Sequence, residues 1–165
     1  MRIYGGKMRE LLTKRWGFTP VALPWADTFT ALQTGMVEGV IGGTPMHAWE
    51  HHRDVITHWV QYNEVFQLYF FLMNRPLWDS LSEEDQQIIL DAANAQSDID
   101  FAVAKEREEE YRQKMRDYGI EVMFPTPEEL EVLAASIRDD VWPELGDRYG
   151  QALMDEVIAY LEGLR

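Results

Sequence analysis

Short apolar runs alternate with amphipathic segments over the first part of the chain. Apolar residues at 1–4, 21–23 and 39–42 are typical of brief strands, and segments 7–16 and 26–34 carry apolar residues at helical spacing. Glycine and proline separate these segments. Because neighbouring parallel strands need a crossover between them, short strands that alternate with helices predict a mostly parallel sheet.

The longest regular segment is predicted to be one helix of unusual length. A capping box starts at Ser82, and no stop signal follows before Gly119, so we expect a helix over about residues 82–118. Beyond Lys105 the segment is polar on all sides, and we expect the helix to leave the hydrophobic core there. Before that point its apolar stripe consists of Ile88, Ala92, Ala95, Ile99 and Ala102.

Two further strands are predicted in the second part of the chain. Residues 65–73 form a continuous apolar and aromatic run, whose length and β-propensity favour a strand buried on both faces. Residues 119–124 form a shorter strand, and Thr126, followed by Pro127, then starts the first of two or three C-terminal helices. The predicted fold class is therefore α/β, with a short, mostly parallel sheet, one very long helix and C-terminal helices.

Charge is divided unevenly along the 165 residues. Residues 1–74 contain six acidic and six basic side chains, whereas residues 75–165 contain 23 acidic and nine basic ones and carry the whole formal charge of −14. This division indicates a neutral α/β part and a helical part with an acidic outer face. Nucleic acid is not an expected partner, because no basic stripe is present to neutralise phosphates. The absence of cysteine excludes disulfides and thiolate metal sites.

One stretch carries a specific family resemblance. Residues 19–43 combine a strand, a Pro-Trp turn, a helix and a second strand that ends in paired glycines. The stretch resembles the signature of the DctP-type solute-binding proteins of tripartite ATP-independent periplasmic (TRAP) transporters, and the start of the predicted long helix resembles theirs as well. The matching residues are Pro20, Trp25, Phe29, 31–35, Val37, Glu38 and Gly39 in the signature, and Leu81, Ser82, Glu84, Gln86 and Ile89 in the helix.

The resemblance implies a periplasmic-binding-protein-like fold of two α/β lobes, which enclose an organic acid and share one long helix. By this resemblance the chain corresponds to the C-terminal half of a receptor. Residues 1–81 would form its second lobe, 82–118 the lobe-spanning helix, and 119–165 an orphan strand with C-terminal helices. The chain as given shows no signal peptide. We therefore expect a periplasmic protein whose signal peptide and first lobe lie outside this chain.

The resemblance also implies a site for a small carboxylate. Arg2, followed by Ile3, falls on the family's arginine, which pairs with the ligand carboxylate through two N–H groups. A planar guanidinium suits this bidentate geometry better than an ammonium group does. Trp25 falls on the family's aromatic residue that packs against the ligand. No cofactor is expected.

The chain departs from the family where many members carry an asparagine amide that helps to hold the acid. Here that position is Gly42. Backbone N–H groups of Gly42, Gly43 and Thr44, at the start of a predicted helix, are expected to replace the amide as an anion-binding nest. Tyr62 and Phe66 are expected at the edge of the cleft.

Other functions and partners stay open. His47, Glu50 and His51 match the H-x-x-E-H pattern of a zinc-dependent hydrolase, with two imidazoles one helical turn apart. An acidic α/β module that recruits a basic partner is a further alternative. A solute receptor would hand its acid to the TRAP membrane subunits. A homodimer through the long helix and the orphan strand at 120–124 would cover the apolar surface that a missing lobe exposes.

Overall fold

Short parallel strand pairs organise the fold. In the computed structural model, which describes residues 1–64 and 68–163, β1 (Arg2–Ile3) pairs in parallel with β2 (Val21–Ala22). On the other side of β1, the predicted third strand contributes only a single parallel bridge, from Arg2 to Val40. β1 is thus central, with backbone partners on both sides.

Helices account for most of the described residues, and their ends follow local signals. Three helices begin at a residue whose side-chain oxygen accepts a hydrogen bond from a backbone N–H of the first turn. These residues are Thr44, Ser82 and Thr126. Gly119 ends the longest helix in the left-handed conformation, at φ 97°. The helices are α1 (Lys7–Arg15), α2 (Thr28–Gln33), α3 (Pro45–His52), α4 (Arg75–Ser80), α5 (Glu83–Tyr118), α6 (Pro127–Asp140), α7 (Gly146–Tyr149) and α8 (Gln151–Glu162), with short 3₁₀ turns at Trp25–Asp27 and Trp142–Leu145.

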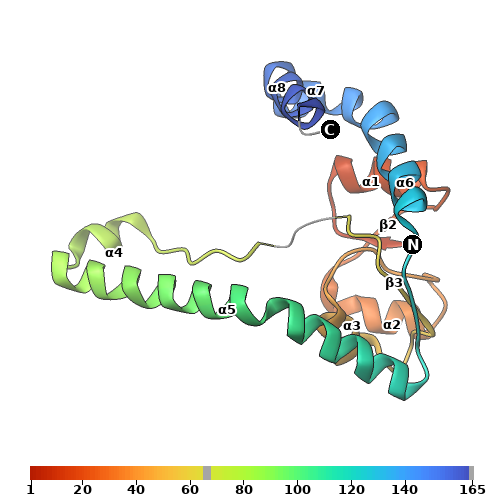
Figure 1. Ribbon diagram of the computed structural model, residues 1–165, viewed down its shortest axis with the longest axis horizontal. Coiled ribbons are helices and arrows are strands. Elements are labelled where there is room, and N and C mark those ends of the chain that lie inside the picture. Colours follow the sequence, from red (N-terminus) through yellow and green to blue (C-terminus); the bar gives the residue numbers. More distant parts are fainter. Residues whose placement is uncertain (65–67, 164–165) are drawn as a thin grey trace.

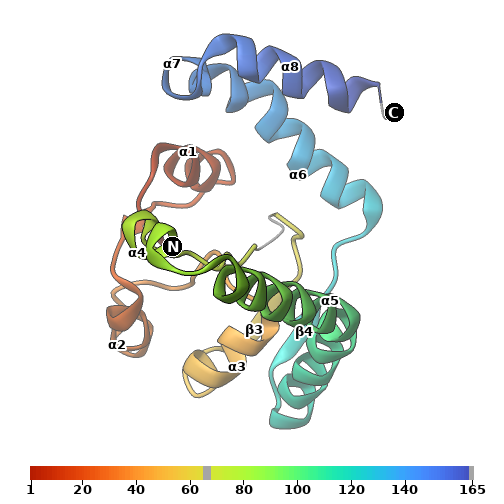
Figure 2. The same cartoon turned by 90° about the vertical axis from the view of Figure 1, so that its left-hand side faces the viewer.

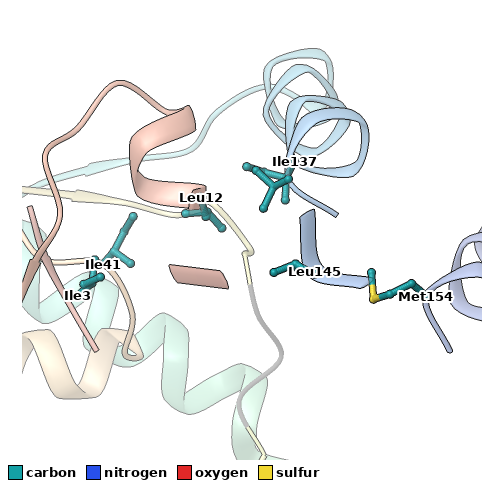
Figure 3. Packing of buried hydrophobic residues seen from close by; sticks show 7 residues of the cluster. Ile3, Leu12, Ile41, Ile137, Leu145 and Met154 are labelled. Carbon is teal, nitrogen blue, oxygen red and sulfur yellow. The ribbon is translucent and has the colours of Figure 1, made fainter. Parts of the chain in front are cut away.

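A main hydrophobic cluster joins the β1 region to the C-terminal helices. Ile3 and Ile41 lie together at the sheet, and Leu12 of α1 lies between them and Ile137 of α6 (Figure 3). Leu145 and Met154 extend the cluster towards α7 and α8. α6, α7 and α8 therefore pack on the α1 side of the lobe (Figure 2).

The predicted orphan strand is paired within the chain. β4 (Glu121–Met123) lies parallel to β3 (His58–Val60), with Trp59 opposite Val122. β3 was not predicted as a strand, because three residues with mixed polarity carry little periodic signal. The expectation that this strand has no partner within the chain is therefore wrong, and a homodimer is not needed to pair it.

α5 confirms the predicted long helix but contacts the lobe at the opposite end from the one expected. Met115 is fully buried beside Ala48 of α3 and Ile120, and Tyr111 donates a hydrogen bond to Glu50 at 3.0 Å. The acidic run before Met115 is paired internally, since Arg112 bridges Glu108 and Glu109. α5 then projects away from the lobe towards its N-terminal end, where α4 lies beside it (Figure 1).

The apolar stripe of α5 consequently faces solvent. Ile88 and Ile99 are 59% and 55% exposed, and Phe101 is 72% exposed. The prediction that the helix packs on the core before Lys105 and leaves it afterwards is therefore wrong, because the part before Lys105 is exposed and Met115 is buried. Helical spacing shows which face of a helix is apolar, but the body that covers this face is set by tertiary contacts. No helix among the described residues is both long and apolar enough to cross a membrane.

A strand was predicted at 65–73, but residues 68–73, the part that the structure describes, do not form one. Residues 65–67 lie outside the described residues, and residues 68–73 adopt no regular structure. Tyr69, Phe70 and Phe71 are each about 70% exposed, and Leu72 is 91% exposed. A strand needs a neighbour to satisfy its backbone groups, and this run pairs with no strand in the described part of the chain.

Candidate functional site

Arg2 occupies the centre of the β1 pairing and is completely buried. Its backbone N–H donates to the Gly39 carbonyl at 2.7 Å, and its carbonyl accepts from the Ile41 N–H at 3.1 Å. In the side chain, Nε and Nη2 donate to the Leu23 carbonyl at 3.2 and 2.9 Å. Nη1 is buried without a partner. Buried guanidinium groups are normally fully hydrogen-bonded, so this N–H group marks a position that favours an acceptor.

Two aromatic rings cover the Arg2 guanidinium. Its Cζ lies 4.0 Å from the Tyr4 ring centroid and 5.4 Å from that of Trp25. The two rings stack on each other with 6.1 Å between centroids and 7° between planes. Sequence reasoning predicted Trp25 but missed Tyr4. Alternation along a strand places residues two apart on one face, so Tyr4 could have been predicted from its spacing to Arg2.

Gly42 and Gly43 let the backbone approach these rings closely. Both have φ near +98°, which favours glycine. A Cβ atom at Gly42 would lie 3.0 Å from Tyr4 Cε2, and one at Gly43 would lie 4.0 Å from Trp25 Cη2. The two glycines thus adjoin the aromatic cover of Arg2.

Thr44 is used chiefly as a helix cap. Its N–H donates to His47 Nδ1 at 3.2 Å, and its hydroxyl oxygen accepts from the His47 backbone N–H at 3.4 Å. The reciprocal pair starts α3 directly after the glycines. One of the three N–H groups expected in the anion-binding nest is therefore already engaged.

Three histidines of α3 surround Trp25. The ring centroids of His47, His51 and His52 lie 6.0, 5.7 and 4.8 Å from that of Trp25. Within residues 1–64 and 68–163, no three or more histidine, aspartate or glutamate side chains gather in a way that could hold a metal ion. His47 also points a ring nitrogen at its own helix start, as the cap requires.

His52 is the buried member of this group, at 2% exposure. Burial, followed by the nearby charges of His51 and Arg2, lowers the pKa of His52 from 6.5 to about 4. The imidazole is therefore neutral at pH 7, and its edge packs on Trp25 without repelling Arg2.

The buried His52 predicts a specific loss of stability in acid. An unfolded chain takes up the His52 proton near pH 6.5, but the folded chain resists it until about pH 4. The free energy of unfolding should accordingly fall between pH 6.5 and pH 4, by on the order of 1–3 kcal/mol from this group. Urea unfolding across this range should show a smaller fall for His52→Gln than for the unchanged protein. The exposed His58→Gln serves as control, because His58 is not among the groups that shift the pKa of His52. Equal slopes for all three proteins would contradict the assignment.

A hollow of about 280 Å³ lies next to the glycines. Its lining includes Gly42, Gly43, His52, Tyr62 and Glu64. The predicted Tyr62 is therefore at the hollow, and its ring also contacts Trp16 at 5.2 Å between centroids. Phe66, the remaining predicted residue, lies outside the described residues.

Arg2 and Trp25 do not line this hollow, but Gly42 and Gly43 link the two places. The structure thus brings five of the predicted site residues together near β1, and Tyr62 lines the adjoining hollow. Those five are Arg2, Trp25, Gly42, Gly43 and Thr44. The residues that sequence reasoning missed are Tyr4, His52 and an ion pair between Arg9 and Glu64.

Comparison with known proteins places this arrangement in a family context. Residues 1–145 match the family described as "Bacterial extracellular solute-binding protein, family 7" (DctP). The ectoine-binding periplasmic protein TeaA of Halomonas elongata is 25% identical over 92% of this chain and 46% of its own length. The C4-dicarboxylate-binding periplasmic protein DctP of Rhodobacter capsulatus is 25% identical over 91% of this chain and 45% of its own. The chain thus spans about half the length of these relatives.

Solved structures show the same fold. A TRAP periplasmic solute-binding protein from Shewanella oneidensis with bound succinate superposes with a TM-score of 0.82, at 21% identity, over 96% of this chain and 52% of that protein. The ectoine-binding protein of the TeaABC TRAP transporter of Halomonas elongata gives 0.81, at 24% identity, over 98% and 54%. From the match over residues 1–145, we conclude that the chain belongs to family 7 of the bacterial extracellular solute-binding proteins, the DctP family.

Proposed function

We propose that the protein is a periplasmic receptor for a small organic acid and that Arg2 binds the carboxylate. The observation that carries the proposal is the buried guanidinium of Arg2, whose Nη1 has no partner while Nε and Nη2 are held by the Leu23 carbonyl. A carboxylate at Nη1 would satisfy this donor with a charge-assisted hydrogen bond. A neutral ligand would leave the positive charge buried and unpaired, which is costly.

Access to Nη1 requires a movement of the aromatic cover. Tyr4 is 40% exposed, whereas Arg2 is fully buried. In our proposal Tyr4 turns aside when the acid enters, and Trp25, packed between α3 and Tyr4, keeps its place against the ligand. The hollow beside Gly42 accommodates the rest of a small acid.

The relatives favour a binding protein over the zinc hydrolase considered from His47, Glu50 and His51. The matched family consists of solute-binding proteins. Two of the compared proteins have acidic ligands. The Rhodobacter capsulatus protein is described as binding C4-dicarboxylates, and the Shewanella oneidensis structure contains succinate. A third is described with glycerol-3-phosphate, which is also an anion. An arginine anchor suits all three of these ligands.

The remaining length of the relatives suggests what covers the exposed apolar surface. We propose that residues 1–81 are the second lobe, that 82–118 cross to a first lobe, and that 119–165 pack back on the second. The first lobe would then cover the stripe of α5 and the aromatic run at 68–73, both of which face solvent in this chain. A hinge movement of the lobes would enclose the acid, and the TRAP membrane subunits would receive it.

Calorimetric titration tests the proposal. The protein expressed from its complete reading frame should bind at least one of butyrate, succinate or a hydroxybutyrate, and should not bind glucose or a dipeptide. The 165-residue chain alone should bind the same acid about 4 kcal/mol more weakly, because one lobe supplies only part of the contacts. This difference corresponds to a millimolar instead of a micromolar Kd. Binding of sugars or peptides only would show that the assignment is wrong.

A further inference from the structure

A second guanidinium lies close to the site and has no role in the function proposed above. Arg9, on α1, forms a short ion pair with Glu64. Its side chain is 22% exposed and that of Glu64 is 12% exposed, so the pair is largely withdrawn from water. Most surface ion pairs in proteins are far more open and contribute little to stability.

This pair lies near Gly42, at the place that Tyr4 fills. Arg9 Nη1 lies 3.8 Å from the point where a Cβ atom of Gly42 would stand, and Tyr4 Cε2 lies 3.0 Å from the same point. Glu64 and Gly42 both line the hollow of about 280 Å³. The same Tyr4 ring also covers Arg2, whose Cζ lies 4.0 Å from the ring centroid. In the proposed function Tyr4 turns aside. The place that its ring leaves would connect Arg2 with the Arg9–Glu64 pair, so a small molecule anchored at Arg2 would reach the pair there.

The backbone before Glu64 is shaped to hold it there. Asn63 has φ +55° and is the one described non-glycine residue with positive φ. Its side-chain oxygen accepts a hydrogen bond from the Gln61 amide at 2.8 Å. Asparagine tolerates the left-handed conformation better than most residues do, yet such conformations are uncommon and are often found at binding sites. This turn brings Glu64 back towards α1.

We propose that the Arg9–Glu64 pair is a second subsite that selects acids carrying a neutral hydroxyl group. The inference rests on the proposed function, because it places the carboxylate of the same ligand at Arg2. A hydroxyl group donates and accepts, so it binds the Glu64 carboxylate and the Arg9 guanidinium together without breaking the pair. A second carboxylate would be repelled by Glu64, and an ammonium group by Arg9, and either would leave one partner of the pair uncompensated.

Four-carbon acids of matched size test the selection. Calorimetry on the protein from its complete reading frame compares butyrate, 2- and 3-hydroxybutyrate, succinate and 4-aminobutyrate. At least one hydroxybutyrate should bind tenfold or more tightly than butyrate, since hydrogen bonds to charged groups are the stronger ones. It should also bind more tightly than succinate and 4-aminobutyrate.

Variants assign the preference to the pair. In Arg9→Met, the hydroxy acid and butyrate should bind within twofold of each other. In Glu64→Gln, which keeps the shape, Arg9 loses its counter-charge and succinate should gain at least tenfold in affinity. Arg15→Met removes a guanidinium from the same helix, where it pairs with Asp140 at 2.5 Å, and should leave the preference unchanged. Melting temperatures show whether each variant is folded.

The outcomes separate the two proposals. If butyrate and both hydroxy acids bind equally, the subsite is wrong but the carboxylate receptor stands. The same conclusion follows if succinate or 4-aminobutyrate is the acid that the unchanged protein binds most tightly. An unchanged preference in a folded Glu64→Gln protein also overturns the subsite. Failure of every acid to bind overturns the proposed function and the subsite with it.

Discussion

Replacing Arg2 by alanine is expected to weaken binding of the organic acid by about 2–5 kcal/mol, which is roughly 30-fold to several thousand-fold in Kd. The loss is large because the ligand carboxylate would be desolvated beside Tyr4 and Trp25 without a cation. Arg2→Lys should lose a similar amount, since an ammonium group cannot hold the Leu23 carbonyl and still present a second donor at the position of Nη1.

Calorimetry on the protein from its complete reading frame measures this effect. Arg15→Ala is the matched control, because Arg15 is exposed on α1 and pairs with Asp140 instead of the site. Arg2 is fully buried, so the melting temperature of each variant must be compared with that of the unchanged protein. A folded Arg2→Lys protein with unaltered affinity would remove Arg2 from the site.

Replacing Met115 by alanine should lower the free energy of unfolding by about 2–5 kcal/mol. Met115 is fully buried where α5 meets α3, and it packs with Ala48 and Ile120. Truncation would leave a cavity in the cluster that fixes the long helix to the lobe. Because α3 begins at Thr44 and carries His52, a loosened contact would also disturb the neighbourhood of Trp25.

Urea unfolding of the protein from its complete reading frame provides the measurement. Met36→Ala changes the same side chain at a position that is 66% exposed, and should alter the free energy of unfolding by no more than about 0.5 kcal/mol. A loss below 1 kcal/mol for Met115→Ala would contradict the packing assigned to α5.

The grouping of several candidate site residues was predictable because their signals are local or belong to the family pattern. Arg2 and Trp25 lie in recognisable segments, and Gly42 and Gly43 stand at the end of a predicted strand. The structure gathers these residues near β1. Local capping also set the ends of α5 correctly, because Ser82 and Gly119 act within one turn of the helix.

The rest of the site depends on contacts between residues far apart in the chain. Arg9 and Glu64 are 55 positions apart, and neither has a neighbour in sequence that indicates the other. In the sequence, His52 is one more polar residue of a histidine-rich helix. Its burial and its contact with Trp25 appear only in the folded chain. No periodic pattern in the sequence indicates these long-range contacts.

By itself the sequence determined most of the helices, the caps at Thr44, Ser82 and Thr126, the parallel character of the strands and the family to which the chain belongs. Each of these depends on residues within a few positions of one another or on a spaced motif. The sequence did not indicate α4. Only the tertiary structure decided that β4 pairs with β3, that α5 is buried at Met115 and not along its apolar stripe, and that residues 68–73 face solvent. An apolar pattern in the sequence indicates that a surface tends to be buried. Which part of the molecule covers that surface depends on the free energy of the whole fold.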